Sequence, residues 1–151
     1  MARFVWRLDK VLNAKGKLEQ AKEAEIHAVA AEIVRVDRQI GSIRSKLRVM
    51  GGKLGELGGA ERLQKQQMYL SHAQYSEQEI TQLGHKRGEL EKIRQEKTAE
   101  LAEIRRSIKV LEKLREKAKQ EWTEEQEKIE QKETDDLNNT RSARRLAGEA
   151  V

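Results

Sequence analysis

The residue types that could carry chemistry are few in this 151-residue chain and lie far apart. Its three histidines are His27, His72 and His85, and the chain has no cysteine to supply a thiolate ligand or a disulfide. A zinc site needs several ligands at short spacing, which these histidines do not provide. Although a hairpin would bring His27 close to His85, we predict no metal site.

Gly52 and Lys53 stand in a glycine cluster and invite comparison with a phosphate-binding loop. The Walker pattern requires Ser or Thr after the lysine and a strand before the loop, whereas Leu54 follows the lysine here. Carboxylates are abundant, but catalysis needs a concave and partly desolvated site to tune them. We therefore predict that the protein is not an enzyme and binds no cofactor.

The apolar residues form two heptad seams, meaning rows at alternating spacings of three and four residues. The second of these seams runs from Ile80 to Ile129 and has cations at several positions. Between the two seams, five glycines at residues 51–59 predict a reversal of the chain. The chain has no proline. This pattern predicts an all-α fold, an elongated antiparallel two-helix coiled-coil hairpin with a longer C-terminal helix. The first seam consists of Ile26, Val29, Ile33, Val36, Ile40, Ile43, Leu47, Met50, Leu54 and Leu57.

We expect one hairpin over residues 1–151, with a first helix at about 3–50, a glycine turn at about 51–60 and a second helix at about 61–146. If the reversal is centred near residue 55, Phe4 faces Ser107. The second helix beyond about residue 112 would then have no partner within the chain and would project alone.

Charge narrows the classes of partner. The net charge is +5, but residues 121–136 carry eight acidic residues against two lysines, a net −6. A nucleic-acid binder would keep its basic stripe continuous, so we predict no nucleic-acid partner. No stretch reaches the roughly 20 apolar residues that cross a bilayer. We expect a soluble, cytoplasmic protein.

The two tryptophans are the side chains best suited to anchor a partner, because Trp is enriched at interface hot spots. Trp6 lies beside Arg7, and Trp122 begins the acidic segment. The alternative is that each tryptophan only caps an apolar seam.

The opening Phe4-x-x-x-Leu8-x-x-Val11-Leu12, followed by a helix rich in lysine and glutamate, resembles the start of the flagellar FliJ family. The two-helix layout and the acidic ending at residues 132–137 resemble that family too. The resemblance implies a cytoplasmic stalk of the flagellar type III export apparatus, peripheral at the membrane only through that apparatus. Its implied partners are a hexameric export ATPase, the export gate protein and export chaperones. The residues it assigns to the ATPase contact are Phe4, Trp6, Arg7, Leu8, Val11, Trp122 and Ile129.

Other classes fit the same residues. The architecture could serve as a stalk of an injectisome, the virulence type III secretion system, or as a stalk subunit of a rotary ATPase. A self-associating structural coiled coil and a nucleic-acid organiser are further alternatives. Binding to a hexameric ATPase distinguishes the stalks from the rest, and a steep salt dependence of DNA binding would favour the organiser.

Overall fold

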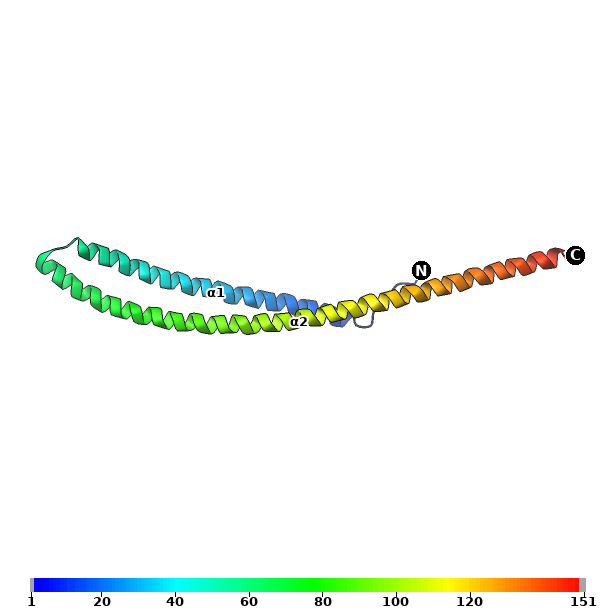
Figure 1. Cartoon of the computed structure of the whole chain (residues 1–151), viewed down its shortest axis with the longest axis horizontal. Helices are drawn as coiled ribbons and strands as arrows, with labels where there is room; N and C mark the ends of the chain where they lie inside the picture. Colours follow the sequence, from blue (N-terminus) through cyan, green and yellow to red (C-terminus); the bar gives the residue numbers. More distant parts are fainter. Residues whose placement is uncertain (1, 150–151) are drawn as a thin grey trace. The chain divides into compact units, whose positions relative to one another are not determined.

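The computed structural model describes residues 2–149, which form two α-helices and no strand. Helix α1 spans Asp9–Gly55 and helix α2 spans Gly59–Glu149. Figure 1 shows α1 running back beside the first part of α2. The prediction of an all-α helical hairpin with a longer second helix is confirmed. Residues 1 and 150–151 of the predicted hairpin lie outside the described residues.

Helix α1 begins at Asp9, later than the predicted start near residue 3. Phe4, Val5 and Trp6 are consecutive bulky residues that lose side-chain freedom in a helix and therefore favour it weakly. The Asp9 amide instead donates to the Trp6 carbonyl at 3.2 Å, which forms a turn before the helix. The Asp9 carboxylate also suits a helix N-terminus, where the backbone dipole favours negative charge.

The chain reverses over Glu56–Gly58, a much shorter segment than the predicted turn at 51–60. The glycines at 51, 52 and 55 remain helical, and only Gly59 has a positive φ, of 70°. At the start of the reversal, the Glu56 amide donates to the Lys53 carbonyl at 3.2 Å, which tightens the end of α1. One glycine in the left-handed region therefore redirects the chain.

The contacts of the chain divide into two compact units. One unit consists of Leu18–Glu103, and the other combines Met1–Lys17 with Ile104–Val151. Each unit therefore contains parts of both helices. The expectation of one unit over the whole chain stays a prediction.

Within the unit Leu18–Glu103, the helices pack along the predicted seams. The most buried apolar side chains are Ile33, Val36 and Leu101, which are 5%, 1% and 7% exposed. Most other seam residues are half-buried, as expected for a pair of helices that covers one face of each. On α2 this packing begins at Tyr69, earlier than the predicted start at Ile80.

Ion pairs between the helices fix their register, and it differs from the prediction. Lys22 Nζ lies 2.7 Å from Glu100 Oε2, and Lys97 Nζ lies 2.8 Å from Glu25 Oε2. The facing residue numbers thus add up to 122 in both pairs. A turn centred near residue 55 would make them add up to about 110. The difference arises because α1 continues through three of the glycines and α2 packs only from Tyr69 onward.

This register also overturns the expected approach of His27 to His85. Glu25, near His27, pairs with Lys97, whereas Lys86, next to His85, lies 3.8 Å from Glu32. Within the described residues, no three His, Asp or Glu side chains gather so that they could hold a metal ion. No helix in that part of the chain is long and apolar enough to span a membrane.

Candidate functional site: the N-terminal clasp

The segment before α1, together with the first residue of α1, contacts α2 through three interactions. The rings of Phe4 and Trp122 lie with centroids 5.7 Å apart and planes tilted by 54°. The guanidinium of Arg115 lies 6.0 Å from the Phe4 ring centre, and its Nε donates to Asp9 Oδ1 at 3.2 Å. We call these four residues, Phe4, Asp9, Arg115 and Trp122, the N-terminal clasp.

Arg115 holds the clasp together because it meets both an aromatic ring and a carboxylate. A tilted aromatic pair contributes about 0.5–1.5 kcal/mol beyond its buried area, and an exposed cation–π contact about 0.5–1 kcal/mol. Both side chains of the pair between Arg115 and Asp9 are partly exposed, so solvent screens the pair and it adds at most about 1 kcal/mol. Together these contacts tie a short non-helical segment to one helix face.

The clasp corrects the predicted position of Phe4 and Trp122. Phe4 does not lie near Ser107, and Trp122 is not part of a projecting arm, because the two rings contact each other. Pairing of the N-terminal segment with α2 therefore reaches beyond residue 112. On α2, Gln126 is the last described side chain that is not exposed, and residues 127–148 are all exposed.

The other predicted site residues divide into covered and exposed ones. Trp6 and Leu8 are half-buried, and the Leu8 carbonyl accepts the first helical hydrogen bond, from Leu12 at 3.0 Å. Arg7 is exposed, and Val11 and Ile129 are each 44% exposed. The predicted apolar wedge of Phe4, Trp6 and Leu8 is thus partly covered by the chain itself.

Three residues of this region escaped the sequence analysis. Val5 is 80% exposed between two half-buried aromatic side chains, a position that no periodic pattern marks. Asp9 and Arg115 carry ordinary charges, and only the fold brings them within 3.2 Å. Of these three residues, only Asp9 had a signal in the sequence, because an acidic residue suits the N-terminus of a helix.

The family model described as "Flagellar FliJ protein" matches residues 4–147 of the chain. The chain belongs to the FliJ family. Its resemblance to this family, stated from the sequence, is confirmed. No individual curated protein and no solved structure gives a significant match.

The region that matches the FliJ family includes all four clasp residues, so the clasp belongs to the part of the chain that the family shares. Proteins of this family are components of flagellar protein export and have a stalk-like role. For this FliJ-family protein, a surface that contacts another protein is therefore the relevant kind of site. The clasp and the side chains exposed around it form such a candidate surface.

Proposed function

We propose that this protein is a cytoplasmic, non-catalytic stalk component of the flagellar type III export apparatus. It inserts into a hexameric export ATPase, stimulates ATP hydrolysis, and links the ATPase to the export gate and the export chaperones. Membership of a flagellar family supports this role over a stalk in an injectisome. It also supports a partner-binding role over a coiled coil that only self-associates.

The clasp is the observation that carries the proposal. By holding the N-terminal segment against α2, it combines residues from both ends of the sequence in one unit. Val5 and Arg7 on this segment, and Val11 in the first turn of α1, are then exposed on a part of the chain that is already held in place. A pre-ordered contact loses less conformational entropy when a partner binds, so more of the contact energy appears as affinity.

The mechanism we propose is allosteric. A ring of six subunits that meets one stalk offers each subunit a different contact, because the stalk itself has no sixfold symmetry. A stalk changes the conformational equilibrium of a subunit only by as much as it binds one conformation more tightly than another. Stimulation therefore depends on specific contacts, here those of Val5, Arg7 and Val11.

The test uses the purified chain and a purified hexameric export ATPase. In a double variant, Val5→Asp with Arg7→Glu, an exposed apolar contact is lost and a charge is reversed. We expect the concentration for half-maximal stimulation to rise about tenfold or more, which corresponds to about 1.4 kcal/mol or more. The helical circular dichroism signal should stay unchanged, because neither residue lies in a helix.

A matched control is Val34→Asp with Arg38→Glu, which changes an exposed valine and an exposed arginine on α1 in the unit Leu18–Glu103. This control should stimulate the ATPase as the unmodified chain does. If the variant in the N-terminal segment also stimulates fully, the clasp surface is not the ATPase contact and the proposal is wrong.

A further inference from the structure

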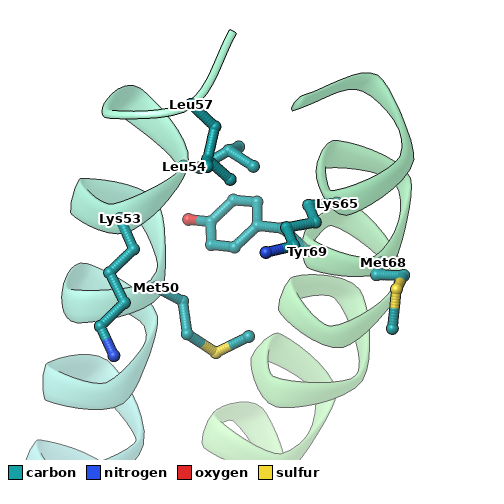
Figure 2. A pocket seen from close by; sticks show the side chains of 7 residues that line it. All are labelled: Met50, Lys53, Leu54, Leu57, Lys65, Met68 and Tyr69. Atoms are coloured by element: carbon teal, nitrogen blue, oxygen red, sulfur yellow. The ribbon is translucent and has the colours of Figure 1, made fainter. Parts of the chain in front are cut away.

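A second surface lies beside the turn, within the unit Leu18–Glu103. It is an open groove of about 300 Å³ between α1 and the start of α2. In Figure 2 the ring of Tyr69 reaches from α2 toward α1, between Leu54 and Met50. The groove is lined by Met50, Lys53, Leu54, Leu57, Lys65, Met68 and Tyr69, and we call it the turn groove.

The turn groove exists because the two apolar seams have different lengths. The seam of α1 continues to Leu54 and Leu57, which are half-buried. On α2, residues 59–68 are all exposed, and its packing begins only at Tyr69. The Tyr69 hydroxyl lies 3.4 Å from the position that a Cβ on Gly51 would take, so the ring fills the space opposite that glycine. Beyond this contact, the seam of α1 has no complete apolar partner on α2.

The rim of the turn groove is basic. Residues 44–65 carry six Lys or Arg against two Glu, a net +4. Lys53 comes from α1 and Lys65 from α2, and both line the groove. Lys65 has one carboxylate nearby, Glu61 at 3.6 Å, and both side chains are more than half exposed. Such an exposed pair is weak, so Lys65 can turn to another carboxylate at little cost.

We propose that the turn groove binds a helical segment of a partner protein that has an apolar anchor flanked by carboxylates. The anchor is an Ile, Leu or Met side chain, which completes the unmatched seam of α1. A carboxylate one helical turn before the anchor and another one turn after it lie on the same helix face, where they meet Lys53 and Lys65. The methionines in the lining suit several anchor shapes, because the Met side chain is flexible and polarisable. This inference does not rest on the ATPase contact.

Binding can be measured with three labelled alanine-rich helical peptides and fluorescence anisotropy. The first has isoleucine at its centre and glutamate four residues to either side. The second replaces both glutamates with lysine, and the third replaces the isoleucine with alanine. With the full chain, we expect the first peptide to bind about tenfold more tightly than either of the others. Equal binding of all three, or binding of none, would overturn the proposal.

The double variant Lys53→Glu with Lys65→Glu should weaken binding of the acidic peptide about tenfold and improve binding of the lysine peptide. The control, Lys92→Glu with Lys109→Glu, makes the same charge change at exposed residues outside the groove and should bind as the unmodified chain does. Equal effects of both variants would show a general charge effect and would contradict the inference.

Binding of the chain to phosphatidylserine vesicles is also measured, because a surface that is both basic and apolar can bind an anionic membrane. Vesicle binding that depends on Lys53 and Lys65, without peptide binding, would assign the groove to lipid and overturn the proposal. Stimulation of the export ATPase is measured on the same groove variant. This stimulation should be unchanged. The test therefore distinguishes a failure of the proposed binding at the turn groove from a failure of the proposed ATPase contact at the clasp.

Discussion

Lys22 lies four residues before Ile26, where the seam of α1 would continue with an apolar residue, and its charge is tolerated because of its partners. Its amine donates to Glu25 at 3.2 Å and lies 2.7 Å from Glu100, while Lys97 donates to Glu25 at 2.8 Å. The hydrogen bond with Glu100 is the main cause that raises the pKa of Lys22. The hydrogen bond from Lys97 is the main cause that lowers the pKa of Glu25. These four charges fix the register of the two helices.

The charged cluster predicts a loss of stability in acid. Because the pKa of Glu25 is lowered from 4.5, its contribution is complete above that value and disappears as the pH falls through the lowered pKa. The contribution of Lys22 is complete below 10.5 and disappears as the pH rises through its raised pKa. Glu25→Gln should therefore lower the urea midpoint near neutral pH and reduce its fall on acidification, followed by circular dichroism.

Glu89→Gln is the control for this prediction, because Glu89 is exposed and outside the cluster. Its acid dependence should match that of the unmodified chain. If Glu25→Gln has the same acid dependence as this control, the lowered pKa of Glu25 does not contribute to stability.

At the level of the helices, glycines near the reversal differ in backbone conformation and therefore differ in what they contribute. Gly52 lies within α1 and has no atom within 4 Å of the position of an added Cβ. Gly59 also has open space, but its φ of 70° belongs to the left-handed region. The first glycine only weakens its helix, whereas the second allows the chain to reverse.

Alanine at these two positions should therefore act in opposite directions. Gly52→Ala should stabilise the protein by about 1 kcal/mol, because alanine favours a helix more than glycine does. Gly59→Ala should destabilise it by about 1–2 kcal/mol, because a Cβ is strained in the left-handed region. Urea denaturation followed by circular dichroism measures both changes. A shift of both variants in the same direction would contradict the assignment of the reversal to Gly59.

The sequence could predict the helices because the periodicity of α1 is strong. Val36 and Ile33, the most buried residues of that helix, occupy expected seam positions. The register could not be predicted, because five neighbouring glycines all permit a turn and only one adopts the positive φ. The late start of α1 escaped prediction for another reason. It accompanies the contact between Phe4 and Trp122, which lie more than 100 residues apart in the sequence.

At the scale of the whole molecule, the two proposed binding surfaces belong to different compact units. The clasp lies in the unit that combines Met1–Lys17 with Ile104–Val151, and the turn groove lies in the unit Leu18–Glu103. Substitutions in one unit can therefore remove one partner without altering the contacts within the other. The proposed role, in which the protein links an ATPase to other export components, requires such separable surfaces.

The end of α2 leads to the last prediction. Residues 127–148 are helical and exposed, and they include Ile129 and Leu137, which are 44% and 60% exposed. A helix supported only by pairs of side chains on its own surface gains a few tenths of a kcal/mol from each pair, too little to resist local opening. In the free protein, amide hydrogen exchange should therefore be much faster in residues 127–148 than around Val36, which is 1% exposed. Adding the hexameric export ATPase should slow exchange in residues 127–148 if this end of α2 belongs to the ATPase contact. Equal protection of both regions in the free protein would show that the end of α2 is stable without a partner.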